Sequence, residues 1–206
     1  MTTSCDLAVI GSGHNALITA CYLARAGLKT LVLERNPHTG GGTVTREIVA
    51  PGFRHDLHSN IHSFIQANPL IANDELGLKS RHGLEYVYTD PVFSSVFPDG
   101  TSIVSYRDVD RTCASIAAVS PADAQAYRDF AQMSARHFPI IAASMFQPPA
   151  QLGPFWALLD QSPEGRELMG ALQRSCYELI SDWFSHEKVV MHMLKFVSEA
   201  LTGPDE

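Results

Sequence analysis

The sequence predicts an α/β protein in which a strand–helix–strand unit at the N-terminus is followed by a β-hairpin and then by a mainly helical segment. Three observations lead to this class: an apolar strand that runs into a glycine-rich turn, a second apolar strand shortly after it, and helical periodicity through the second half. The 206 residues are 45% hydrophobic and 18% charged, as in ordinary globular proteins. A formal net charge of −7 argues against nucleic-acid binding, which requires a basic face.

The N-terminal unit is predicted to be a right-handed βαβ motif with parallel strands. Residues 6–11 form a short apolar strand, and residues 29–34 form a second one. The apolar residues between the two strands recur at helical spacing up to Gly27. A glycine is expected just past a helix end, because the left-handed backbone conformation found there costs it little.

The rest of the chain is predicted to be irregular at first and then regular. From Pro37 to about Leu78 the sequence is rich in turn-forming residues. A strand is predicted at 84–88, and a hairpin is predicted from 93–97 and 102–106 with the turn Pro98-Asp99-Gly100-Thr101 between them. Helices are predicted at 109–119 after an Asp108 cap, from Pro121 after a Ser120 cap, and near 152–160, 163–184 and 187–201.

The hexapeptide GSGHNA that follows the first strand matches the dinucleotide-binding pattern GxGxx(G/A). Gly11 makes the tight turn, Gly13 lets backbone N–H groups approach a pyrophosphate, and Ala16 lets the helix pack closely on the strands. His14 and Asn15 lie between them at the helix N-terminus, where the helix dipole favours phosphate. A short glycine pattern alone is a weak indication, but its place between a strand and a helix is what this chemistry requires.

An acidic residue stands where such proteins bind a ribose. Glu34 closes the second strand, and its carboxylate is expected to accept hydrogen bonds from the ribose hydroxyls. The same charge repels a 2′-phosphate, so NADP is disfavoured at this site. Arg35 is adjacent and could soften that repulsion, although an exposed arginine is the simpler interpretation.

A second glycine cluster distinguishes between NAD and FAD. Gly40, Gly41 and Gly42 come shortly after the acidic residue and precede Thr43. In flavoproteins with this βαβ unit, such glycines let the loop after the second strand pass close to the cofactor, whereas classical NAD dehydrogenases usually continue into another helix. We therefore predict a second cofactor loop and FAD as the ligand. The alternative is a flexible glycine linker.

Two segments resemble the phytoene dehydrogenase-like flavoproteins, in particular the branch that includes pyridine nucleotide-disulfide oxidoreductase domain-containing protein 2: DLAVIGSGHNALITACYLARAGLKTLVLERN and GGGTVTREIVAPGFRHDLHS. The resemblance covers most of the chain and departs from the usual pattern at Ala16, often glycine, and at Gly42, often alanine. We expect residues 1–66 to be the N-terminal part of an FAD-binding domain. Residues 67–206 are expected to be part of a substrate-binding domain, with a β-hairpin at about 84–106 and helices at about 108–201.

The resemblance implies an FAD-dependent enzyme that oxidises a C–C or C–N bond of a small or apolar substrate by hydride transfer to the flavin. Some relatives isomerise double bonds, so a redox-neutral flavin isomerase stays open, as do a non-catalytic assembly subunit and an NAD-binding regulatory module. Such proteins are commonly much longer, and two parallel strands cannot cover both faces of a sheet. We therefore expect a fold that is incomplete without the complementary C-terminal half on a separate chain. A truncated fragment is the alternative.

The segment after the second glycine loop holds the candidate catalytic residues. His55, His58 and His62 have spacings that suit a metal site on one helical face. The family segment lies near the flavin instead, so no metal site is predicted. Asp56 and His58 are the candidate catalytic pair, in which the imidazole could accept a proton near neutral pH. Ordinary loop histidines are the alternative.

Cysteine usage and the N-terminus favour a cytoplasmic protein. The four cysteines are scattered and form no CxxC pair, which is typical of reduced thiols. No basic region precedes the first apolar strand, so a signal peptide is not expected. No apolar run approaches the roughly 20 residues of a membrane-spanning helix, although peripheral membrane contact stays possible.

Overall fold

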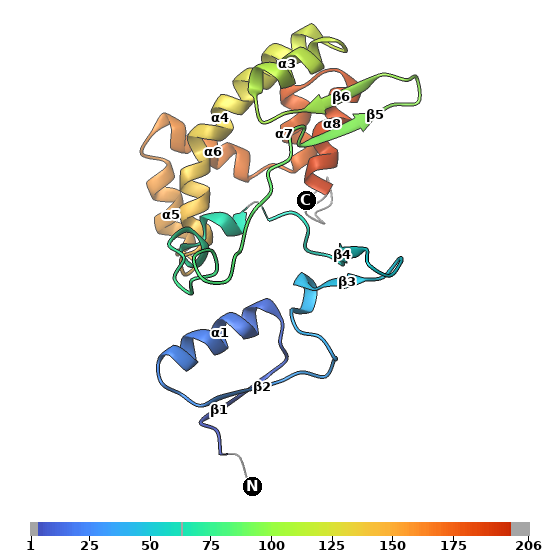
Figure 1. The fold of residues 1–206 in the computed structure, drawn as a ribbon. Helices are drawn as coiled ribbons and strands as arrows, with labels where there is room; N and C mark the ends of the chain where they lie inside the picture. The colour runs from blue at the N-terminus through green and yellow to red at the C-terminus, as the bar shows by residue number, and fades with distance from the viewer. Residues whose placement is uncertain (1–3, 63, 199–206) are drawn as a thin grey trace. The chain divides into compact units, whose positions relative to one another are not determined.

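The computed structural model describes residues 4–62 and 64–198, and it divides the chain into two compact units, Met1–Leu84 and Glu85–Glu206 (Figure 1). The first unit contains short strands, one long helix and a series of turns. The second unit contains a β-hairpin and six helices among its described residues. Together they make a mixed α/β protein that starts with a Rossmann-like βαβ motif, as the sequence predicts.

The βαβ motif is formed by β1 (Leu7–Ile10), α1 (His14–Arg25) and β2 (Thr30–Leu33). The strands pair in parallel, and Leu7 lies opposite Thr30. The helix ends where the glycine predicts, because Gly27 follows the C-cap residue with a φ of +91° and donates its N–H to the Ala24 carbonyl. The strands, the helix and their parallel order therefore agree with the prediction.

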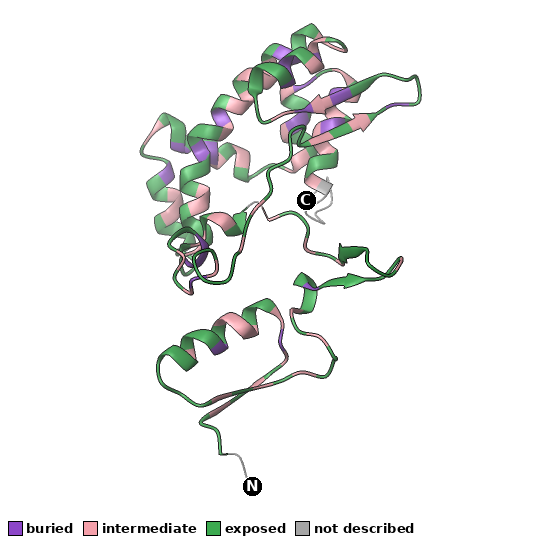
Figure 2. Cartoon of the chain, viewed as in Figure 1, coloured by how far each residue is buried: buried purple, intermediate pink, exposed green. Residues whose placement is uncertain are grey.

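One face of this two-stranded sheet is open. Side chains alternate between half-buried and exposed along both strands, and α1 packs against the half-buried face (Figure 2). On the other face Ile10 is 79% exposed, and Leu31 and Leu33 are 43% and 48% exposed. Parallel strands in proteins are almost always covered on both faces. The described residues of the first unit provide no such cover for the second face.

The segment expected to be irregular contains several short elements. A 3₁₀ turn, Gly41–Thr43, leads into β3 (Thr45–Glu47), which pairs antiparallel with β4 (Arg54–Asp56). A second 3₁₀ turn at Phe64–Ala67 and the short α2 (Pro69–Ala72) follow. The three-residue strands are exposed along their whole length, so no apolar alternation reveals them in the sequence.

The second unit begins with the predicted hairpin but lacks one predicted strand. β5 (Phe93–Val96) pairs antiparallel with β6 (Ser102–Ser105), and the turn between them forms at Pro98–Thr101. The prediction of a strand at 84–88 is wrong. Its alternating aromatic residues resemble a strand, but no described strand pairs with this segment, so the ladder that defines a strand is missing.

The helices of the second unit begin at the predicted caps. The side chains of Asp108 and Ser120 accept hydrogen bonds from the backbone N–H groups of Arg111 and Asp123. The helices of this unit are α3 (Val109–Ala117), α4 (Pro121–Met145), α5 (Leu152–Leu159), α6 (Pro163–Leu172), α7 (Cys176–Trp183) and α8 (Glu187–Ser198). The expected helix end at residue 201 lies outside the described residues.

The single helix predicted over 163–184 is wrong, because the chain breaks between α6 and α7. Ser175 starts α7 with a capping box: its hydroxyl accepts from the Glu178 N–H, and the Glu178 carboxylate accepts from the Ser175 N–H. Apolar periodicity continues across this junction and hides it. The serine followed three residues later by a glutamate is the local feature that could have revealed it.

The core of the second unit lies between the hairpin and α3, α4, α7 and α8. Ile103, Ile116 and Val189 are fully buried there, and Phe184 is nearly so. Two polar side chains are buried with them. Asp123 accepts the backbone N–H groups of Ser185 and His186 at 3.0 and 2.8 Å, and His192 lies between two serine hydroxyls. Among the residues that the structure describes, no helix is long and apolar enough to cross a membrane.

Candidate dinucleotide site

The glycine-rich turn joins β1 to α1 as the fingerprint requires. Gly11 turns the chain with a φ of +91°, a conformation that favours glycine. Gly13 is the N-cap of α1 and has no side chain to satisfy the first N–H groups of the helix. His14 and Asn15 are exposed in the first turn, and Ala16 is half-buried. The turn therefore presents unpaired N–H groups and the positive end of the helix dipole.

The surface of this turn is open enough for a phosphate. A Cβ built on Gly11 or on Gly13 would meet no protein atom within 4 Å. A side chain at either position would fill this space and hold a ligand away from the backbone. The residues present thus fit the pyrophosphate of a dinucleotide, and they are those that the sequence assigns to it.

Glu34 lies directly after β2 and its carboxylate is held by four hydrogen bonds. Its Oε2 accepts from both the N–H and the hydroxyl of Ser12, each at 2.7 Å. Its Oε1 accepts from the N–H and the side-chain amide of Asn36, at 2.8 and 3.0 Å. These bonds, first those from Asn36 and then those from Ser12, lower the pKa of Glu34 to about 2. The carboxylate is therefore ionised at neutral pH, as an acceptor for ribose hydroxyls must be.

The second glycine cluster lies against the first. The Gly40 N–H donates to the Ser12 carbonyl at 2.8 Å, and Gly40 forms a parallel β-bridge with Gly13. A Cβ built on Gly41 would come within 2.9 Å of the Gly13 Cα. The hydroxyl of Thr43 donates to the Gly40 carbonyl, which closes the loop on itself. The structure therefore brings the two predicted cofactor loops together.

Two flanking residues of this loop face solvent. Arg35 and Gly42 are exposed. A Cβ on Gly42 would meet nothing within 4 Å, in contrast to Gly41. The Gly42 carbonyl accepts the N–H of Ser59 at 3.3 Å, and this bond connects the glycine loop to the segment after β4.

The predicted catalytic pair lies on and just after β4. Asp56 is the last residue of the strand, and its carboxylate accepts the hydroxyl of Thr45 across the ladder. His58 is exposed and lies between Leu57 and Ser59, whose N–H groups donate to Val44 and Gly42. The structure therefore places His58 beside the second glycine loop.

The histidine spacing does not correspond to one helical face. His55 belongs to β4, and His62 pairs with the hydroxyl of Ser59 at 2.6 Å. In the part of the chain that the structure describes, no three metal-ligating side chains come together. The assumption of a helix over these histidines was wrong, because the Pro51-Gly52 turn and the β3–β4 pairing set this segment instead.

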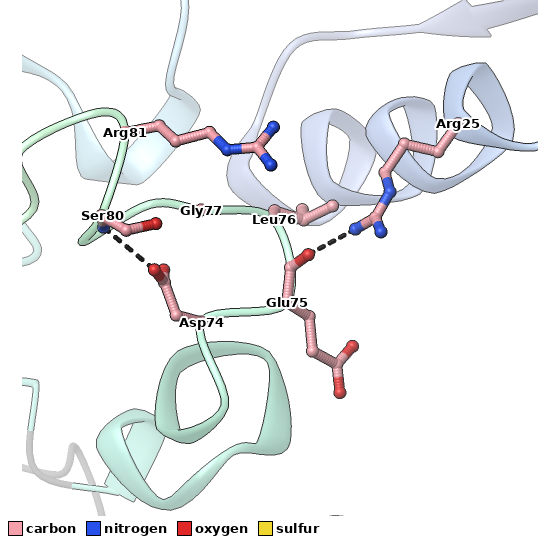
Figure 3. Close-up of a pocket in the computed structure, with 7 residues that line it drawn as sticks. All are labelled: Arg25, Asp74, Glu75, Leu76, Gly77, Ser80 and Arg81. Atoms are coloured by element: carbon pink, nitrogen blue, oxygen red, sulfur yellow. Dashed lines mark hydrogen bonds between the residues drawn. The ribbon is translucent and has the colours of Figure 1, made fainter.

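A small cavity lies at the other end of α1. Its volume is about 190 Å³, and Figure 3 shows the arginine side chains that approach it. Arg25, in the last turn of α1, donates to the Glu75 carbonyl, and Asp74 accepts the N–H of Ser80. The helix is 12 residues long, so roughly 18 Å of helix separates this cavity from the glycine-rich turn. The cavity is therefore separate from the dinucleotide site.

Sequence reasoning missed two residues of the site, Ser12 and Asn36. Both act on the carboxylate of Glu34 rather than on a ligand. The second position of the fingerprint accepts many residue types, so Ser12 carries no motif. Its hydroxyl beside an essential acid was the available indication, and an asparagine two residues after an acid is typical of a local turn.

Comparison with known proteins places these features in context. The family model described as "NAD(P)-binding Rossmann-like domain" matches residues 9–72. The chain is 34% identical to one of the named subunits of limonene dehydrogenase from Castellaniella defragrans, over 87% of this chain and 32% of the relative. It is 37% identical to pyridine nucleotide-disulfide oxidoreductase domain-containing protein 2 of Mus musculus, over 64% of this chain and 23% of that protein.

A third relative extends the comparison to carotenoid enzymes. The chain is 27% identical to carotenoid 3,4-desaturase of Haloarcula japonica over 89% of its own length and 36% of that enzyme. The chain thus spans about a third or less of the length of these relatives. The first relative is named as part of a dehydrogenase, and the other names describe an oxidoreductase and a desaturase.

Proposed function

We propose that this chain, which belongs to the phytoene dehydrogenase-like oxidoreductase family, binds FAD and forms the N-terminal part of an FAD-dependent dehydrogenase. The observation that carries the proposal is the contact between the two glycine loops beside Glu34. A Rossmann-like motif alone is compatible with several dinucleotides. The second loop adds a surface next to the phosphate turn that an NAD site does not require.

The residues of this chain would divide the work of binding among them. The N–H groups behind Gly11 and Gly13 would hold the pyrophosphate, and Glu34 would accept the ribose hydroxyls. Gly40 and Gly41 would let the second loop approach the same ligand. An ionised Glu34 disfavours a 2′-phosphate by charge repulsion, which makes NADP the least suitable dinucleotide.

The cofactor, when bound, would supply hydride chemistry, so the protein needs to bind, orient and exclude water. We propose that His58, with Asp56 nearby, lies on the substrate side of the second glycine loop. The bonds from Leu57 to Val44 and from Ser59 to Gly42 support this, because they fix His58 to that loop. An exposed imidazole there could take up the proton that leaves the substrate when a C–H bond is broken.

The substrate class is proposed from the relatives. Their names mention a monoterpene and a carotenoid, both apolar hydrocarbons or close derivatives. We propose that this chain contributes to dehydrogenation of a C–C or C–N bond in a small or apolar molecule. The second unit would form part of the wall around that molecule.

The complementary part of the fold is proposed to be a second chain. Ile10, Leu31 and Leu33 leave one face of the parallel sheet exposed, and such faces are normally covered. The limonene dehydrogenase relative is named as a subunit, which supports an enzyme made of more than one chain. The further strands of the dinucleotide domain would cover this face.

The reaction is tested with protein purified from its native host together with any chain that co-purifies. Its visible spectrum is recorded without added cofactor, and apolar alkenes and amines are then added in the absence of oxygen. The proposal predicts a flavin spectrum that bleaches with a dehydrogenation substrate. A colourless protein that gains no flavin spectrum when FAD is added would overturn it.

A further inference from the structure

Ser12 is the point at which the parts of the dinucleotide site meet. Its side chain is almost completely buried, at 1% exposure, although it is polar. Its N–H and its hydroxyl both donate to Oε2 of Glu34 at 2.7 Å, and its carbonyl accepts the Gly40 N–H at 2.8 Å. One residue of the phosphate turn is therefore bonded to the ribose-binding acid and to the second glycine loop.

The four donors around Glu34 differ in how firmly they are held. A carboxylate offers about four acceptor positions, and Ser12 and Asn36 supply four donors. The Ser12 donors are fixed, because one is backbone and the other is buried. The side-chain amide of Asn36 makes the longest of the four bonds, at 3.0 Å, and comes from an exposed residue. It is the donor that an incoming hydroxyl can displace most easily.

We propose that Ser12 is a positioning residue that holds Glu34 for the ribose hydroxyls, and that the Asn36 side chain occupies their place until a dinucleotide binds. The inference rests on the proposed function, because it needs a ligand with a ribose. A carboxylate already fixed in one orientation loses little conformational freedom on binding, which strengthens the complex. The two residues thus have opposite effects: Ser12 favours binding and the Asn36 amide competes with it.

The test compares Ser12→Ala and Asn36→Ala in the full chain, together with any chain that co-purifies. Each substitution removes one side-chain donor and keeps the backbone N–H bond. FAD affinity is measured by fluorescence titration of the cofactor-free protein. We expect Ser12→Ala to weaken FAD binding about tenfold, since a hydrogen bond to a charged group is lost. Asn36→Ala is expected to leave the affinity unchanged or to increase it.

Two further measurements separate positioning from a structural role. An FAD analogue whose adenosine ribose lacks the 2′-hydroxyl should show a smaller loss for Ser12→Ala, because part of the contact with Glu34 is already missing. In the Glu34→Gln background, Ser12→Ala should cause little further loss. Equal losses with both ligands, or fully additive losses with Glu34→Gln, would overturn the inference. Native protein that binds no FAD would instead reject the proposed function.

Discussion

Gly41 lies so close to Gly13 that a Cβ on Gly41 would come within 2.9 Å of the Gly13 Cα. Gly41 also has a φ of +59°, in the left-handed region. The requirement for glycine at this position therefore comes from the neighbouring loop as well as from a cofactor. The two glycine clusters, far apart in the sequence, constrain each other.

Replacing Gly41 by alanine is expected to separate the two loops. The left-handed conformation and the backbone contact together should cost roughly 1–3 kcal/mol, and FAD binding should weaken with them. Gly42→Ala is the matched control, because its Cβ would meet nothing within 4 Å and its φ is not in the left-handed region. FAD affinity and urea unfolding check both variants. Equal effects of the two substitutions would contradict the packing account.

Asp123→Asn should destabilise the second unit. The Asp123 side chain is 3% exposed and accepts the N–H groups of Ser185 and His186 at the start of α8. An amide can satisfy only one of the two donors, so a buried N–H loses its partner at a cost of about 2 kcal/mol. Asp129→Asn, on an exposed residue of the same helix, should change the free energy of unfolding by less than about 0.5 kcal/mol. Urea unfolding followed by tryptophan fluorescence compares the two.

The second unit should lose stability in mild acid through His192. This side chain is fully buried between the hydroxyls of Ser95 and Ser105 and stacks on Phe93. Burial, with a smaller contribution from Lys195, lowers its pKa from 6.5 to about 4. The neutral form is favoured in the folded state, so the unfolded chain binds more protons as the pH falls below 6.5.

The resulting loss is roughly 3 kcal/mol between pH 6.5 and pH 4, with no contribution above this range. His192→Gln keeps a hydrogen-bonding side chain but does not titrate. The difference in unfolding free energy between wild type and this variant should therefore shrink as the pH is lowered through this window. A difference that stays constant from pH 7 to pH 4 would show that His192 does not titrate in this way.

The open sheet face should matter for assembly rather than for the stability of the isolated chain. Ile10 is 79% exposed, so Ile10→Gln should change the unfolding free energy by less than about 0.5 kcal/mol. If a second chain covers this face, the same substitution should weaken its co-purification. Val96→Gln, on a residue that is 77% exposed in the second unit, is the control. Loss of the partner with both variants, or with neither, would argue against the face as its binding surface.

Local patterns determined how much of the fold could be predicted. The strands and helix around Gly11 to Glu34 and the caps at Asp108 and Ser120 follow from spacing within a few residues. The β3–β4 pair and the absence of a strand at 84–88 depend on which segments meet in space, and no local pattern encodes that. For this reason the sequence favoured an irregular segment and an extra strand.

The site follows the same division. Gly11, Gly13 and Glu34 are recognisable because the chemistry of phosphate and ribose fixes their type and spacing. Ser12 acts through Glu34, 22 residues away, and the need for Gly41 arises from Gly13. Such relationships appear only when the two loops are placed together.

The identity of the bound cofactor tests the central claim most directly. Protein purified from its native host, with any associated chain, is denatured, and the released small molecules are identified and quantified by mass spectrometry. We expect about one FAD for each copy of this chain, because one glycine-rich turn and one Glu34 serve one adenosine diphosphate group. NAD in place of FAD, or protein that neither carries nor takes up FAD, would contradict the assignment of this site.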